Sequence, residues 1–318
     1  MERALYQSDR RTRTFVIGTR GSPLALAQTE LAAAALRAAH PGVALEVRQV
    51  RTRGDRDQHT PLAQLGAQGV FVKDIENALR VGEIDLAVHS LKDMPSEQPE
   101  RLVIAAVLER EDPRDALVSR LGLGLERLPR GARIGTGSLR RQAQLRALRP
   151  DLEVVDLRGN VDTRLRKAAS EEFDAVVLAL AGLVRLGRAA EVTAILPLDV
   201  MLPAVGQGAI CIEVRADDGE ALALARAIDH PATRAATTAE RSFLHELGGG
   251  CHVPIAAHAV LEGGYLWLRG LVASCDGARV VRGSMSGLPG LAEDLGQSLA
   301  RQLLAQGSSE LLSEAGHD

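Results

Sequence analysis

The chain has 318 residues, which is enough for two or three domains, because single hydrophobic cores stop growing at about 250–300 residues. Hydrophobic residues make up 46% and charged residues 25%, as in an ordinary globular protein, but aromatic residues make up only 2%. The formal net charge of −3 and the scarcity of aromatic side chains argue against a dedicated nucleic-acid binder.

The first residues, MERALYQSDRRTRT, contain no apolar run of the kind a signal peptide needs, and no later run of 18 apolar residues predicts a membrane span. The three cysteines, Cys211, Cys251 and Cys275, form no Cys-x-x-Cys pair. A metal site needs spaced ligands, and the neighbouring Cys251 and His252 are a poor pair. We therefore expect a cytoplasmic protein that binds neither a membrane nor a metal.

Three segments of the first half of the chain recur in the same order further on. Each copy starts with a strand, a tight Gly turn and a helix, continues with a strand that ends in Arg-Gly, and closes with an Asp that enters an apolar strand. The matched pairs are Phe15–Leu31 with Ala132–Leu148, Leu45–Asp55 with Leu152–Asn160, and Gly82–Met94 with Glu171–Leu183.

This repeat predicts two similar α/β domains, each a strand–helix alternation around a mostly parallel sheet. Apolar Ala209–Val214 resembles a further buried strand, which we expect to return to the first domain. After about Pro231, a helix, two strand-like pieces and a closing helix predict a small α+β third domain. The expected boundaries are 14–108 with 209–226 for the first domain, 113–204 for the second and 231–318 for the third.

The helix starts of the repeat predict anion sites. Ser22 and Ser138 occupy N-cap positions, where a hydroxyl accepts from first-turn amides, and Pro23 follows where its missing N–H costs nothing. Free amides at a helix start favour a carboxylate or a phosphate. If the two domains face each other, these helix starts face one crevice. Well-capped helices without a ligand are the plain alternative.

Positive charge is concentrated between residues 131 and 188, with eleven Arg and Lys against seven Asp and Glu. Several of these arginines fall at strand-to-helix turns, where open α/β sheets bind ligands. Arginine matches carboxylates and phosphates bidentately, so convergence on one anionic ligand is expected in preference to a scattered solvated face. The arginines at these turns are Arg140, Arg141, Arg158, Arg164 and Arg185.

The segment AVHSLKDMP ends an apolar strand in polar residues. If the strand continued, alternation would place Ser90 and Lys92 on one side and His89 and Asp93 on the other. An Asp beside a Lys is usually a surface ion pair, but at the carboxyl end of a strand it suits stabilising a cation or passing a proton. The second copy has Ala-Gly at the Lys-Asp position, which suggests a single chemical centre.

Cys251 follows three glycines in ELGGGCHVPI, and this setting leaves several interpretations open. With His252 alone it makes a poor metal site, and no partner is fixed for a catalytic thiolate. A buried, inert thiol fits Cys211, in its apolar run, better than it fits Cys251. The glycines permit unusual backbone angles and close approach, which an attachment point that projects into a cleft would need.

From about Val16 to the final helix, the chain resembles the hydroxymethylbilane synthases, a family also called porphobilinogen deaminases. Members join four porphobilinogen molecules head to tail, with release of ammonia, into the linear tetrapyrrole hydroxymethylbilane. The resemblance implies a monomeric transferase of tetrapyrrole biosynthesis. It rests on the motifs IGTRGSPLALAQ, VRTRGD, FVKDIE, AVHSLKDMP, EREDPRDALVS, GTGSLRRQAQL, LRGNVDTRL, LPAVGQGA and GGGCHVPI.

The resemblance also implies roles for individual residues. The family's dipyrromethane primer is bound by a thioether to the cysteine of the glycine loop, which corresponds to Cys251. The acid of the strand-end motif falls on Asp93, which would contact pyrrole N–H groups, assist ammonia departure and stabilise cationic intermediates. Phe71 matches an aromatic residue that lies over the substrate, although a core role is its alternative. The carboxylates of substrate and primer would be held by Arg20, Ser22, Ser90, Lys92, Thr136, Ser138, Arg140, Arg141, Arg158, Arg164, Arg185 and Gln207.

The sequence departs from the family pattern at three positions. Gln68 and Val184 stand where lysine often occurs, which puts a lysine-dependent loop closure in doubt, and Gly137 replaces a serine. Two other functions remain as alternatives. A non-catalytic anion-binding module is suggested by the two-domain crevice, which is similar to that of periplasmic solute-binding proteins. Single-strand nucleic-acid binding through the basic cluster lacks the interleaved aromatics of such proteins.

Overall fold

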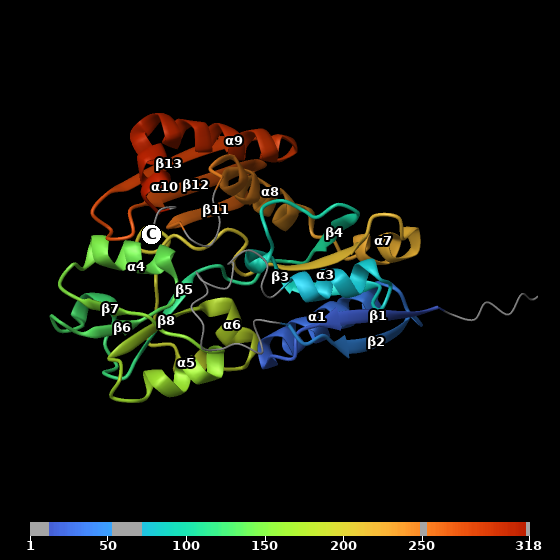
Figure 1. Ribbon diagram of the computed structural model, residues 1–318, viewed down its shortest axis with the longest axis horizontal. Coiled ribbons are helices and arrows are strands. Elements are labelled where there is room, and N and C mark those ends of the chain that lie inside the picture. Colours follow the sequence, from blue (N-terminus) through green and yellow to red (C-terminus); the bar gives the residue numbers. More distant parts are fainter. Residues whose placement is uncertain (1–12, 53–71, 249–252, 316–318) are drawn as a thin grey trace, which may run out of the picture.

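The computed structural model describes residues 13–52, 72–248 and 253–315, which form three units (Figure 1). Two units contain five-stranded sheets with helices, and the third contains a three-stranded sheet with helices. The third unit, coloured orange to red in Figure 1, lies above the junction of the other two. The predicted fold class, two similar α/β domains and a small α+β domain, is thereby confirmed. No helix within these three ranges is long and apolar enough to cross a membrane.

The first sheet combines parallel and antiparallel strands. Strand β1 runs parallel to both of its neighbours, whereas β10 runs antiparallel to β3 and β4. The predicted strand at Ala209–Val214 is β10, and its return to the first sheet is confirmed. The spatial order is β2 (Ala44–Gln49), β1 (Thr14–Thr19), β3 (Leu86–Ser90), β10 (Ile210–Arg215) and β4 (Leu102–Val107).

Helices cover both faces of this sheet. Helix α1 (Pro23–Ala39) packs against the face that carries Val88, through buried residues such as Leu36. Helix α3 (Lys73–Arg80) covers the face that carries Ala87. Because neighbouring residues of a strand point to opposite faces, β3 supplies apolar side chains to both layers. Full burial of one such leucine stabilises the fold by about 1.5–3 kcal/mol.

The second sheet repeats the strand order of the first. Its parallel strands come first in space, and its antiparallel strand β5 lies in the fourth place, like β10 in the first sheet. The predicted duplication is therefore confirmed, and four of the five strands in each sheet run in one direction, as a mostly parallel sheet requires, while one strand is reversed. Strands β5 and β10 each enter their sheet from the other domain and run in the reverse direction. The order is β7 (Glu153–Val155), β6 (Arg133–Gly135), β8 (Ala175–Ala179), β5 (Asp115–Ser119) and β9 (Ala194–Ile195).

The third unit is an antiparallel sheet covered by two long helices. Helices α8 (Pro231–Glu246) and α9 (Ala292–Leu303) pack closely where a Cβ on Gly296 would lie 2.3 Å from a carbonyl oxygen of α8. Glycine is therefore needed at this helix crossing. The sequence analysis found two of the three strands and missed the first, whose alanine-rich stretch has weak strand propensity. The strands are β11 (Ile255–Glu262), β12 (Tyr265–Ala273) and β13 (Val280–Gly287).

The remaining helices are short and connect these layers. The structure does not test the residue numbers at which each domain begins and ends, so the three domain boundaries stay a prediction. The helices are α4 (Leu139–Leu148), α5 (Val161–Ala168), α6 (Leu180–Arg185), α7 (Gly219–Arg226) and α10 (Ser309–Ala315).

A buried ion pair fastens the third unit to the segments that cross between the two sheets. Glu240 of α8 is fully buried, and its carboxylate accepts from Nη1 of Arg110 at 2.5 Å. The same carboxylate accepts from the backbone N–H groups of Gly206 and Ala259, each at 2.7 Å. Arg110 lies in one crossing segment and Gly206 in the other, so one carboxylate joins both to α8.

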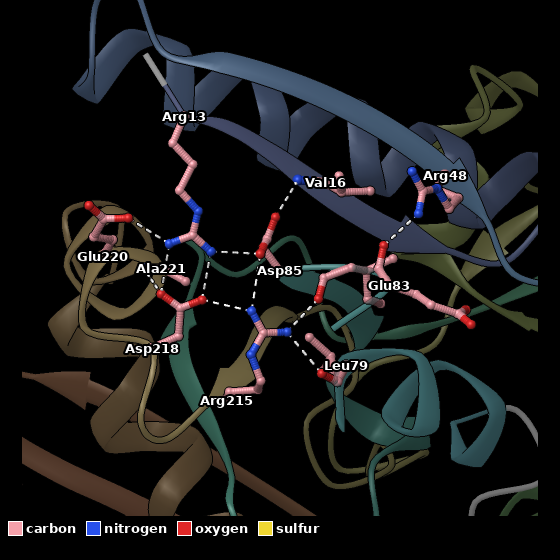
Figure 2. A network of polar contacts seen from close by, with 11 residues as sticks. Arg13, Val16, Arg48, Leu79, Glu83, Asp85, Arg215, Asp218, Glu220 and Ala221 are labelled. Atoms are coloured by element: carbon pink, nitrogen blue, oxygen red, sulfur yellow. Dashed lines mark hydrogen bonds and ion pairs between the residues drawn. The ribbon is translucent and has the colours of Figure 1, made fainter. Parts of the chain in front are cut away.

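A second polar network links chain segments at the edge of the first sheet that lies opposite the carboxyl end of β3 (Figure 2). Arg13 contacts Asp85 at 2.7 Å and Asp218 at 2.8 Å, and Arg215 contacts the same two carboxylates. The hydrogen bond from Arg13 is the main cause that holds the pKa of Asp218 well below its usual range. Because Asp85 directly precedes β3, this network braces the end of the sheet opposite Ser90.

Candidate active site

A cavity lies between the two α/β domains and is lined by both. The first domain contributes Gln28, Ser90 and Lys92, and the turn before β10 contributes Gly208. The second domain contributes Arg141, Arg164 and Arg185. The residues that line this cavity, called the cationic cavity below, include no acid. The predicted convergence of arginines is confirmed for these three.

Backbone carbonyl groups hold all three arginines, and Nη1 of Arg141 donates to the carbonyl of Val177 at 3.0 Å. Nε of Arg164 donates to the carbonyl of Gly159 at 2.8 Å, and Nη2 of Arg185 donates to that of Gly208 at 2.5 Å. Burial, with the neighbouring Arg141, lowers the pKa of Arg164 to about 10, and burial also lowers the pKa of Arg185. Both remain charged at neutral pH and have lost much of their water, so a carboxylate that enters the cavity gains strongly from pairing with them.

Asp115 neutralises the two arginines that open α4. Its carboxylate lies 2.9 Å from Nη2 of Arg140 and 2.7 Å from Nη2 of Arg141, and all three residues are at most 5% exposed. Burial raises the pKa of Asp115, but the two guanidinium groups more than offset this and hold it well below its usual range. Arg141 reaches the cationic cavity, whereas Arg140 points to the carbonyl of Leu202 and lines neither described cavity.

A second cavity adjoins the first at the carboxyl end of β3 and is called the acid cavity below. Strand β3 ends at Ser90, and residues Leu91–Asp93 form a 3₁₀ turn, so the strand alternation expected for this segment stops there. The turn leaves Asp93 exposed in the acid cavity and directs Lys92 to the cationic one. The acid cavity is lined by Arg20, Ser22, Leu24, Ala25, Gln28, Val72, Val88, His89, Ser90 and Asp93.

The surroundings of Lys92 lower the pKa of its ammonium group. Desolvation is the main cause that lowers its pKa to about 8, and the charge of Asp93 opposes this effect. Positive charge on the nearby Arg141 acts in the same direction as desolvation. The ammonium group therefore stays mostly charged at neutral pH but loses its proton at a lower pH than an ordinary lysine, and an anion bound beside it favours its charged form.

Gln28 belongs to the site and was missed by the sequence analysis. It lies on α1, lines both cavities, is 4% exposed and exchanges hydrogen bonds of 2.8 and 3.1 Å with Ser90. The signal was the Ala-Gln that both copies of the repeat share. Gln144, its counterpart in α4, holds the backbone of Leu202 instead.

The helix caps differ between the two copies. Ser22 accepts from the N–H of Ala25 at 3.3 Å, as predicted. Ser138 occupies the N-cap of α4, but its hydroxyl makes no capping bond, so that prediction is wrong. The backbone N–H of Ser138 instead donates to Oγ1 of the buried Thr136.

The other predicted ligands lie outside the two described cavity linings. Gln207 is buried and donates to Asp115 and to the carbonyl of Pro113, so it ties the crossing segments together. Arg158 pairs with Asp156 at 3.3 Å. Phe71, Cys251 and Gln68 fall outside the described residues. The residues predicted as ligands that line neither described cavity are Thr136, Ser138, Arg140, Arg158 and Gln207.

The structure shows the surroundings of two positions at which the chain departs from the family pattern. A Cβ at Gly137 would lie 2.8 Å from the carbonyl oxygen of Leu157, so glycine fits where a serine would require the backbone to move. Val184 is 39% exposed on α6. Cys211 is the buried, inert thiol that the sequence predicts, and burial raises its pKa. Within the described residues, no group of three or more His, Cys, Asp or Glu is placed to hold a metal ion.

Comparison with known proteins identifies the family of the chain. Residues 15–223 match the family model "Porphobilinogen deaminase, dipyromethane cofactor binding domain", and residues 235–305 match "Porphobilinogen deaminase, C-terminal domain". The chain is 53% identical over 300 residues to a porphobilinogen deaminase of Roseiflexus castenholzii, covering 94% of this chain and 99% of that one. It is 50% identical over 302 residues to that of Syntrophomonas wolfei, covering 95% and 99%.

Among solved structures, the chain is similar to the VFT2 domain of Bordetella pertussis BvgS, with 16% identity and a TM-score of 0.41 over 68% of this chain and 85% of that one. It is similar to the methionine-binding protein MetQ, with 15% identity and a TM-score of 0.43 over 67% and 88%. The family assignment rests instead on the two matched models and the relatives at half identity. This chain therefore belongs to the porphobilinogen deaminase family.

Proposed function

We propose that Asp93 is the catalytic acid–base group and that the cations of both domains hold the substrate's carboxylates. As a porphobilinogen deaminase, the enzyme makes hydroxymethylbilane from porphobilinogen in tetrapyrrole biosynthesis. The single observation that supports this division of roles is the pair of adjoining cavities. One is rich in cations without an acid, and the other contains the exposed carboxylate of Asp93.

The cationic cavity suits a group with several carboxylates, such as the dipyrromethane cofactor. Nε of Arg141 is buried and has no hydrogen-bond partner, so it is a donor that a bound anion could satisfy. We propose Lys92, Arg141, Arg164 and Arg185 as the residues that hold its acetate and propionate groups. When bound, the cofactor supplies the pyrrole carbon to which the first substrate molecule is joined.

Asp93 is placed to act on the reacting part of the substrate. Each condensation breaks the bond between the aminomethyl carbon and nitrogen, and it removes a proton from the pyrrole carbon that is attacked. A carboxylate beside the pyrrole N–H groups stabilises positive charge that develops as the amine departs. The same carboxylate can accept the proton that is then lost. The cations of the neighbouring cavity would orient the substrate for both events.

Cys251 is the proposed point of cofactor attachment. The third unit, whose helix α8 precedes the glycine loop, contacts the segment just after Asp93. Nη2 of Arg241 donates to the carbonyl of Pro95 at 2.7 Å and to that of Ser96 at 3.2 Å. This contact supports a tether that reaches the acid cavity from α8.

We also propose that the enzyme works as a cytoplasmic monomer. Cys211 is a buried free thiol, which suits a reducing compartment. Size-exclusion chromatography with light scattering checks the oligomeric state, and a mass twice that of the chain would contradict the proposed monomer.

The cation assignment is tested by Arg164→Gln, with Arg166→Gln as the matched control. Arg166 lies on the same helix but outside both cavities, and it donates only to Thr163. A hydrogen bond to a charged group contributes about 1.5–3 kcal/mol, so we expect the KM for porphobilinogen to rise about tenfold to a hundredfold in Arg164→Gln. Steady-state kinetics with equal KM values for the two variants would contradict the assignment.

A further inference from the structure

Three ionisable side chains lie buried between the first sheet and α3. Glu213 of β10 is fully buried, His89 of β3 is 6% exposed and Glu76 of α3 is 4% exposed. Nε2 of His89 lies 3.1 Å from Oε2 of Glu213. Among the residues that the structure describes, one buried carboxylate oxygen of Glu213 and one of Glu76 find no hydrogen-bond partner.

This placement is costly, because apolar side chains surround the three groups. The cluster of Ile75, Leu79 and Ala87 packs on one side of them, and that of Leu91 and Cys211 packs on the other. Burying ionisable groups costs several kcal/mol per ion unless they are paired and fully bonded, and an apolar core would avoid this cost. The established residues of the site do not use these groups, so their presence in the core calls for a different role.

His89 connects the buried carboxylates to the reaction site. It is the member of the trio that lines the acid cavity, where Asp93 also lies. Because Glu213 accepts at Nε2, this carboxylate fixes the tautomer with a proton on Nε2 and leaves Nδ1 as the nitrogen able to accept another.

We propose that His89, oriented by Glu213, relays the proton that Asp93 collects in each condensation. The O–H bond of the Asp93 carboxyl group breaks and an N–H bond forms at Nδ1 of His89, so Asp93 becomes a carboxylate again. The imidazolium then gives this proton to the ammonia that was released, which departs as ammonium. Glu213 is a positioning residue, because it acts through His89, whereas His89 itself exchanges the proton with Asp93 and with ammonia. This inference rests on the role proposed for Asp93.

Other charged groups near the trio fit this role. Desolvation, followed by the charge of Glu213, raises the pKa of Glu76. The charged and titratable groups that surround the trio are Lys73 and Arg80 on α3, Cys211 on β10, Arg20 and Asp93 in the acid cavity, and Arg234 and Arg241 on α8.

The test compares Glu213→Gln and His89→Gln with Glu76→Gln, which neutralises a neighbouring buried carboxylate; within the described residues it is Glu213 that pairs with His89. The relay predicts that kcat falls at least about tenfold in the first two variants, with KM unchanged and a larger solvent isotope effect. It predicts a kcat within about twofold of the parent for Glu76→Gln. Circular dichroism of each variant confirms that the fold is retained.

A second measurement keeps the proposal testable if these glutamine variants fold poorly. In His89→Ala, added imidazole should restore at least part of the lost kcat, which a purely structural histidine would not allow. Unchanged kcat in Glu213→Gln and His89→Gln, or a folded His89→Ala that imidazole does not rescue, would overturn the relay. Normal turnover in Asp93→Asn would instead refute the role of Asp93, so the two failures are distinguishable.

Discussion

Asp93→Asn is expected to lower kcat by about 10²–10⁴, the usual contribution of a positioned acid–base group. Asn keeps the size and one carbonyl oxygen of the side chain but loses the negative charge and the ability to carry a proton. Because Asp93 is exposed in the acid cavity, the change should leave the fold and the binding of carboxylates largely intact. Single-turnover and steady-state assays with porphobilinogen measure this effect.

The matched control for this prediction is Glu97→Gln. Glu97 is an exposed acid of the same connecting segment and lines neither described cavity. Its replacement should leave kcat within about twofold of the parent, as for most surface changes. Near-normal turnover in Asp93→Asn would contradict the assigned role, whatever the control shows.

Asp115→Asn is expected to lower the free energy of unfolding by about 3–5 kcal/mol, because it leaves Arg140 and Arg141 buried without their counter-ion. The change also disturbs the bond of 2.8 Å from Nε2 of Gln207. Denaturant unfolding followed by circular dichroism measures the loss. Because Arg141 lines the cationic cavity, substrate binding should weaken as well.

Asp112→Asn is the control for the buried pair. Asp112 lies three residues earlier and pairs at 2.5 Å with Arg114, whose side chain is 41% exposed. Exposed ion pairs contribute at most about 1 kcal/mol, so this variant should unfold close to the parent. Equal stabilities for the two variants would show that Asp115 is not the counter-ion on which α4 depends.

Much of the fold could be predicted because the repeat is visible in short local signals. An apolar strand, a Gly turn and a capped helix are each specified by neighbouring residues, so both copies were found. The direction of β5 and β10 could not be predicted from the sequence, because it depends on how the chain crosses between the domains. Strand β11 was missed because its alanines carry little strand propensity and are ordered by packing against α8.

The residues of the site also differ in whether local sequence signals could predict them. Lys92 and Asp93 lie in the turn that follows β3, and Arg185 ends the short helix that follows β8, so the sequence places them near one edge of each sheet. The ion-pair partner of Arg141 could not be predicted, because Asp115 lies on a strand that enters the sheet out of sequence order. The same holds for His89, whose carboxylate partner on β10 is 124 residues away.

The central claim is that this chain builds its product on a covalent primer held by Cys251. The most direct test is the intact mass of the denatured protein after incubation with porphobilinogen, compared with a Cys251→Ala variant treated in the same way. The parent should carry a surplus equal to two linked pyrrole units, and the variant should carry none. A parent of unmodified mass after this incubation, or a variant that keeps the surplus, would contradict the claim.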